Sequence, residues 1–200
     1  MESSAAQGFD GGNSETEPRA YPWKTELADL EVTFRMMTAE DVSKMLTFTK
    51  ELPERDLLFL RYDITDPVVV AEWVGNIERG RTLTILAEEQ GHLMGYCSLL
   101  RSDILWTRHL GEIQMLVGPN YRGKGVGGHL ARQIFSFARQ QGLQKVVAHM
   151  MSTQRDGQSL FQGLGFIPEA LLNDWAIDRA GRTHDMIMMS REVEEGSLDD

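Results

Sequence analysis

The fold of this chain is decided by the stretch Val117-Gly118-Pro119-Asn120-Tyr121-Arg122-Gly123-Lys124-Gly125-Val126-Gly127-Gly128. An apolar segment at 109–117 leads into it and an amphipathic segment that runs to Gln141 follows, which predicts a strand, a turn and the start of a helix. Glycines let the backbone approach a ligand closely, and the first amides of a helix have no intrahelical partner. Together with the helix dipole and the cations Arg122 and Lys124, this pattern predicts a site for a di- or triphosphate.

Two common phosphate-binding motifs match this stretch in part. The spacing Gly123-x-Gly125-x-x-Gly128 fits the dinucleotide fingerprint, but about 20 residues further on Lys145 stands where that motif needs an acid. The spacing Gly118-x-x-x-x-Gly123-Lys124 fits a Walker A loop, but Gly125 stands where Ser or Thr must hold magnesium. A glycine-rich turn without a ligand is a third interpretation, although each glycine weakens helix entry by about 0.5–1 kcal/mol.

The pattern outside the loop predicts a mixed α/β domain over residues 31–192. Strands are expected at 31–36, 81–87, 92–100, 109–117, 143–151, 167–177 and 183–190, and helices at 39–50, 53–61, 66–78, 126–141 and 156–164. We therefore expect a mostly antiparallel twisted sheet of about six or seven strands, with helices on both faces.

Composition and charge limit the classes of protein that this chain can belong to. Its 200 residues are 42% hydrophobic and 25% charged, as in an ordinary globular domain. Of the net charge of -10, residues 1–30 carry -4 and residues 193–200 carry another -4. We expect residues 1–30 to be an acidic, largely disordered segment, with a partner-binding arm as the alternative, and residues 193–200 to be an acidic tail. No basic patch stands out, so no nucleic-acid partner is expected.

The remaining composition bears on location and metals. The chain holds a single cysteine, Cys97, which suits a reducing compartment. No apolar stretch has the length of a membrane span, so we expect no membrane association and a cytoplasmic location. The adjacent pair His184-Asp185 supplies two metal-ligand types but not a complete site, so no metal is expected.

Within the loop, Arg122-x-x-Gly125-x-Gly127 resembles the pyrophosphate-binding loop of the GNAT N-acetyltransferase superfamily. The resemblance covers most of residues 31–192. The segment 31–41 is similar to the family's first strand and helix, and Ser159-Leu160-Phe161-Gln162-Gly163-Leu164-Gly165-Phe166 resembles its fourth-helix signature. The resemblance implies a GNAT-type sheet, acetyl-CoA as co-substrate and transfer of an acetyl group to a primary amine.

The same resemblance implies which residues bind acetyl-CoA. Backbone groups of Met115, Leu116 and Val117 would bond the pantetheine arm. The pyrophosphate would be held by Arg122, Gly123, Lys124, Gly125, Val126, Gly127 and Gly128. Gln154 stands where the family usually has an asparagine near pantetheine, and Phe161 stands where a tyrosine often protonates the departing thiolate. A thiol with a pKa of about 8.5 can leave as thiolate unaided.

An amine acceptor must lose a proton before it attacks the thioester, so a nearby carboxylate or imidazole is needed as general base. Glu112 is the first candidate, because it lies where the superfamily's protein-lysine acetyltransferases carry their base, and desolvation is expected to raise its pKa. The second candidate is His149, on the strand at 143–151. The alternatives are that Glu112 is a solvated acid paired with Arg or Lys, and that His149 is a hydrogen-bonded core residue.

The acceptor pocket is expected to be lined by residues 52–66 with Trp106 and Trp175. The part at 52–62 resembles a helix of protein-lysine acetyltransferases, so a protein lysine is the first acceptor expected. A small-molecule amine is the alternative acceptor. A catalytically silent acyl-CoA-binding regulatory module is an alternative function, and a homodimer stays open.

Overall fold

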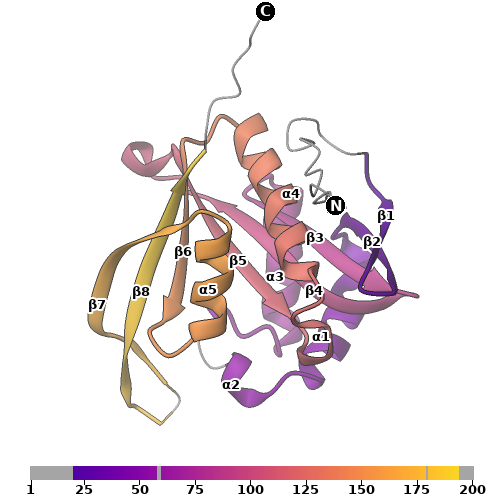
Figure 1. Ribbon diagram of the computed structural model, residues 1–200, viewed down its shortest axis with the longest axis horizontal. Helices are drawn as coiled ribbons and strands as arrows, with labels where there is room; N and C mark the ends of the chain where they lie inside the picture. The colour runs from indigo at the N-terminus through magenta and orange to yellow at the C-terminus, as the bar shows by residue number, and fades with distance from the viewer. Residues whose placement is uncertain (1–19, 58–59, 179, 194–200) are drawn as a thin grey trace, which may run out of the picture.

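The computed structural model describes residues 20–57, 60–178 and 180–193. These residues form one eight-stranded sheet in the order β1-β2-β3-β4-β5-β6-β8-β7 (Figure 1). All neighbouring strands run antiparallel except β5 and β6, which are parallel. The predicted fold class, a mixed α/β domain with a mostly antiparallel sheet, is confirmed.

Most elements lie within a few residues of the predicted ranges. The strands are β1 (Trp23–Leu27), β2 (Leu30–Met36), β3 (Thr82–Glu89), β4 (His92–Arg101), β5 (Leu110–Val117), β6 (Lys145–Met151), β7 (Ile167–Ile177) and β8 (Thr183–Glu192). The helices are α1 (Val42–Lys50), α2 (Glu54–Leu57), α3 (Pro67–Glu78), α4 (Val126–Gln140) and α5 (Arg155–Gly163). Short 3-10 turns lie at Ala39–Asp41, Leu105–Thr107 and Pro119–Tyr121.

Helices cover both faces of the sheet, as expected. In Figure 1, α4 and α5 lie in front of the strands and α1 and α3 lie behind them. Because side chains alternate along a strand, Leu99 and Ile113 pack into the core under α4, while Tyr96 and Leu116 pack toward α1 and α3. The two faces therefore carry two separate apolar cores.

The sheet begins earlier than the sequence predicted. The expected disorder of residues 1–30 is wrong for Trp23–Leu27, which form β1 and pair with β2. The Trp23 ring stacks on Phe34 with 4.5 Å between the ring centroids, and the Tyr21 hydroxyl donates to Gln133 at 3.0 Å. Edge strands are short and half exposed, so their alternation is weak in the sequence. Residues 1–19 of the expected acidic segment 1–30, and residues 194–200 of the expected acidic tail 193–200, lie outside the described residues.

An ion-pair network fixes the first helix to the sheet. The guanidinium of Arg35 on β2 bonds both Asp41, at 2.5 Å, and Glu88 on β3, at 2.6 Å. Lys44 on α1 also reaches Glu88, at 2.6 Å. Asp41 and Glu88 are buried, so their charges depend on these partners.

The parallel strands β5 and β6 pair over a short distance. Their register joins Leu110–Glu112 with Lys145–Val147. Within the described part of the chain, the two strands do not pair beyond these residues. On its other side β5 stays paired with β4 from Gly111 to Val117. We call residues 113–117 the open edge of β5, because this part of the strand has a paired neighbour on one side alone.

Candidate active site

The open edge of β5 offers backbone groups to a ligand. Opposed residues of an antiparallel pair alternate between bonding each other and pointing their backbone groups outward. The amide of Gly118 donates to Met94 O at 2.8 Å, and Arg122 Nε donates to Val117 O at 3.0 Å. This alternation directs the backbone groups of Met115 and Val117 away from β4 and those of Leu116 toward it. Met115 and the amide of Val117 thus fit the predicted pantetheine contact, since Val117 O already accepts from Arg122. Leu116 faces the core behind the sheet.

The glycine loop ends at the first turn of α4, close to this edge. Gly123 and Gly125 have positive φ angles of 74° and 86°, a conformation that favours glycine. A Cβ added at either residue would meet nothing within 4 Å, so the space in front of the loop is open. The amides of the first turn have no intrahelical acceptor and the helix dipole favours an anion here. These observations fit the pyrophosphate of acetyl-CoA.

The two cations of the loop have partners of their own. Arg122 bonds Asp56 on α2 at 2.6 Å as well as Val117 O, so its side chain ties the loop to β5 and α2. Lys124 lies over the ring of Tyr121, 5.7 Å from its centroid. Arg122 is therefore in place to shape the loop, and the Asp56 carboxylate that accepts from it offsets part of its charge.

The remaining loop residues differ in what they contribute. The side chain of Val126 is buried in the core under α4. A Cβ at Gly127 would come within 3.2 Å of Leu160 and 3.5 Å of Met115, so packing of α4 on β5 and α5 already favours glycine there. At Gly128 a Cβ would approach no atom other than the Arg132 side chain, at 3.7 Å. Gly128 thus lies on the open side of the helix.

Gln154 lies at the turn from β6 to α5, and Phe161 lies within α5. Gln154 accepts from the amide of Met151 at 2.7 Å, so its side-chain carbonyl closes this turn. Gln158 supports the same turn, donating to Met151 O at 3.2 Å. Phe161 is buried and packs edge-on against Phe166 with 4.8 Å between centroids. No pattern in the sequence indicated that Gln158 supports this turn.

The two candidate bases lie together where β5 and β6 separate. Glu112 Oε1 lies 3.6 Å from His149 Nδ1 and accepts from Gln114 Nε2 at 3.2 Å. The other carboxylate oxygen of Glu112 forms an ion pair with Arg61. The sequence predicted Glu112 and His149 as two separate candidates for the general base; the structure places them side by side.

The pKa of Glu112 is opposite to expectation. Burial alone raises this pKa, as predicted. The hydrogen bond from His149, the charge of Arg61 and the bond from Gln114 outweigh burial and lower it to about 2. The predicted rise is therefore wrong, because the sequence does not show that Arg61 comes to this carboxylate.

A cavity of about 50 Å³ lies beside Glu112, on the α1 and α3 side of the sheet. From the predicted segment 52–66, three residues other than Arg61 line it, namely Leu60, Tyr62 and Ile64. Strand and helix residues complete the wall: Val69, Glu72, Trp73, Asn76, Thr82, Tyr96, Ser98, Leu100 and Gln114. Trp106 and Trp175 do not line it; they are 78% and 65% exposed elsewhere on the surface.

A polar hydrogen-bond chain stiffens this wall. Trp73 Nε1 donates to Thr84 Oγ1 at 3.1 Å, and Thr84 Oγ1 lies 2.9 Å from Ser98 Oγ. Ser98 pairs across the strands with Gln114, which in turn contacts Glu112. The cavity is thus connected to the candidate base through neighbouring side chains on one face of the sheet.

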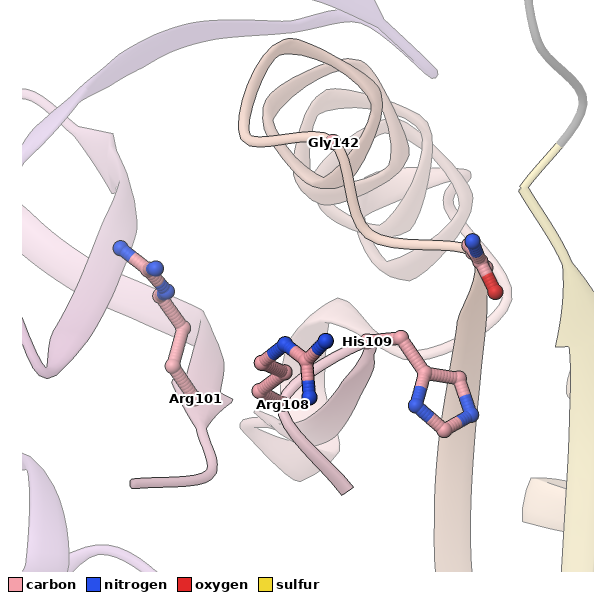
Figure 2. A pocket seen from close by; sticks show the side chains of 5 residues that line it. Arg101, Arg108, His109 and Gly142 are labelled. Atoms are coloured by element: carbon pink, nitrogen blue, oxygen red, sulfur yellow. The ribbon is translucent and has the colours of Figure 1, made fainter. Parts of the chain in front are cut away.

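A second cavity, of about 420 Å³, lies at the opposite end of β5 (Figure 2). It is lined by Arg101, Arg108, His109, Gly142 and Gln144. His109 comes directly before β5, and Gly142 follows α4, whereas the glycine loop follows β5 and precedes α4. This cavity therefore lies apart from the candidate active site.

Residues 20–57, 60–178 and 180–193 contain no group of three His, Cys, Asp or Glu side chains arranged to hold a metal ion. His184 bonds Asp178 at 3.0 Å, and Asp185 instead accepts from the amide of Asp174. None of the helices that the structure describes is long and apolar enough to cross a membrane.

An open strand edge, a helix start suited to an anion and a buried carboxylate beside an imidazole make up a candidate group-transfer site for a phosphate-bearing donor. The sequence model of the acetyltransferase (GNAT) family matches residues 46–166. The chain belongs to this family, which confirms the expected class of acetyl-CoA-dependent N-acetyltransferases.

The chain is similar to named relatives and to solved structures. The chain is 30% identical over 116 residues to the L-amino acid N-acyltransferase MnaT of Escherichia coli, an alignment that covers 56% of this chain and 64% of MnaT. YncA of Salmonella typhimurium, solved with acetyl-CoA, superposes with a TM-score of 0.71 at 22% identity over 84% of this chain and 98% of YncA.

A Sinorhizobium meliloti phosphinothricin acetyltransferase in complex with acetyl-CoA also gives a TM-score of 0.71, at 21% identity. That superposition covers 84% of this chain and 92% of the phosphinothricin acetyltransferase. Both solved structures show a shared fold. The names of these three relatives do not support the expected protein-lysine branch.

Proposed function

We propose that this chain transfers the acetyl group of acetyl-CoA to the primary amine of a small molecule. The observation that carries this proposal is the position of Glu112 and His149, between the open edge of β5 and the 50 Å³ cavity. A donor bound along β5 and an acceptor in the cavity would meet at these two side chains.

The chain's own groups suit each part of this reaction. The amides at the start of α4 bind pyrophosphate, and the backbone of Met115 and Val117 aligns the pantetheine arm. The strand rise places Glu112 about 17 Å from Val117, toward the far end of that arm. Acetyl-CoA, when bound, supplies the thioester carbon that the amine attacks. Glu112 takes the ammonium proton, and the partly exposed His149 passes protons toward solvent.

Two observations favour a small acceptor over a protein lysine. The acceptor site is a small cavity walled by Trp73, Tyr96 and the residues around Arg61, which suits a compact amine. The relatives MnaT and the phosphinothricin acetyltransferase are named for an L-amino acid and for phosphinothricin. We therefore place the acceptor among small amines, with amino acids first.

The test is acetyl transfer to a panel of acceptors. Acetyl-CoA is mixed with the protein and with L-amino acids, polyamines or lysine-containing peptides, and released thiol and acetylated product are both measured. We expect product with small amines, loss of product in Glu112→Gln, and none lost in the control Glu31→Gln, whose carboxylate pairs with exposed Lys24. Product from peptides alone would instead assign a protein lysine. Acetyl-CoA binding without any product would identify a silent binding module.

A further inference from the structure

The ion pair between Arg61 and Glu112 lies between the acceptor cavity and the candidate base. Arg61 lines the cavity, and its guanidinium bonds the carboxylate of Glu112. Arg61 precedes α3, whereas Glu112 lies on β5, 51 residues later in the chain. An acceptor that enters the cavity therefore encounters a Glu112 carboxylate that is still paired with Arg61.

In the resting site Glu112 is a weak base. Its carboxylate faces Arg61, Gln114 and His149, and these three partners favour its charged form over the protonated one. The pKa of about 2 that results leaves little driving force for taking a proton from an ammonium group. Both carboxylate oxygens of Glu112 are already engaged by these partners, so one partner has to withdraw before the carboxylate can accept from an ammonium group.

Arg61 is the partner best suited to withdraw. Its side chain is 51% exposed, compared with 22% for Glu112. A guanidinium has five N–H donors and pairs well with a second carboxylate in bidentate geometry. Glu72 is the one acidic residue among those lining the cavity, so an incoming anion would find Arg61 as its natural counter-ion.

We propose that the acceptor is a zwitterion, with an anionic group close to its amine, and that this anion draws Arg61 away from Glu112 and so activates the base. An α-amino acid is the simplest molecule of this class. Its carboxylate pairs with Arg61 while its ammonium pairs with Glu112, so one protein ion pair is exchanged for two. This inference rests on the proposed function and names its substrate class.

The bonds and protons of the step balance. Glu112 takes one proton from the ammonium, and the neutral amine nitrogen forms a bond to the thioester carbon as the carbon–sulfur bond breaks. The sulfur leaves as thiolate, and the second amine proton passes to it or, through His149, to solvent. Glu112 then returns its own proton to solvent, and Arg61 pairs with Glu112 again when the product leaves.

The experiment compares three acceptors that differ in the anionic group alone: an L-amino acid, its carboxamide and the corresponding decarboxylated amine. In the native protein we expect kcat to be at least about tenfold higher for the amino acid than for its amide or amine. The advantage of the amino acid would thus not be confined to KM. In Arg61→Met the amino acid loses this advantage, and kcat for the amide and the amine rises above its native value. A residue that merely binds carboxylate would not accelerate substrates that lack one.

The pH profile gives an independent readout. Without Arg61, Glu112 faces Gln114 and His149 and keeps its proton to a higher pH, so the acid limb of kcat/KM for the amide moves to higher pH. The control is Arg81→Met, which removes an arginine from the exposed pair with Asp103. An unchanged ratio between the three acceptors in Arg61→Met would overturn this inference while product formation still supports the proposed function. No product from any amine would overturn both.

Discussion

Gly125→Ala and Gly142→Ala form a matched pair that tests the donor site. Both glycines flank α4, Gly125 at its start and Gly142 beyond its end, with φ angles of 86° and 67°. A Cβ at either residue would meet no atom within 4 Å. The two substitutions therefore carry the same kind of backbone strain. They differ because Gly125 lies at the proposed pyrophosphate site and Gly142 does not.

The expected magnitudes follow from this geometry. Alanine in the left-handed region costs about 1–2 kcal/mol, so each variant should melt a few degrees below the native protein, by about 2–4 °C per kcal/mol. At Gly125 the methyl group also enters the space assigned to pyrophosphate. Loss of one charge-assisted hydrogen bond there, about 1.5–3 kcal/mol, weakens acetyl-CoA binding by about ten- to hundredfold.

Isothermal calorimetry gives the acetyl-CoA Kd, and thermal melts with and without the ligand give the stabilisation. We expect Gly142→Ala to bind as the native protein does and Gly125→Ala to bind more weakly. Equal Kd values for the two variants and the native protein would refute the placement of the pyrophosphate at this loop. Equal weakening in both would show that the effect arises from strain in α4.

Further predictions concern the base and the ion-pair network. Glu112→Gln should lower kcat/KM by about 10²–10⁴, while the melting shift with acetyl-CoA stays at its native size. Arg35→Met should destabilise the fold by about 3 kcal/mol in urea unfolding, because Asp41 and Glu88 stay buried without it. Although burial raises their pKa, hydrogen bonds from Arg35 hold the pKa of both carboxyls below the usual range. The free energy of unfolding of the native protein should thus stay constant above about pH 5 and fall as the pH drops below about 4. A free energy of unfolding that does not change below about pH 4 would contradict this.

Local patterns in the sequence predicted the glycine loop and the helix that follows it. The glycine loop is defined by consecutive residues, and the period of α4 is visible in Val126, Leu130, Ile134 and Ala138, all of which are buried. The position of the loop and the start of the helix depend on the backbone preferences of these neighbouring residues. A sequence therefore carries this information within about 20 residues.

The environment of the base was not predictable in the same way. Glu112 was identified by its place on a strand, but its pKa depends on Arg61 and His149, which lie 51 and 37 positions away in the chain. Desolvation was expected correctly and is the largest single effect on this pKa, but the lowering effects of the partners together outweigh it. Pairings over such distances depend on tertiary packing and leave no local pattern.

The segment from α2 to Arg61 connects the two halves of the site. Asp56 on α2 bonds Arg122 at 2.6 Å and so contacts the donor loop. Five residues later Arg61 bonds Glu112 and lines the acceptor cavity. The sequence assigned this segment to the acceptor alone, but the two ion pairs join Asp56 to the donor loop and Arg61 to the candidate base. If an acceptor anion draws Arg61 toward the cavity, the same segment carries Asp56, so acceptor binding and the position of the donor loop should be linked.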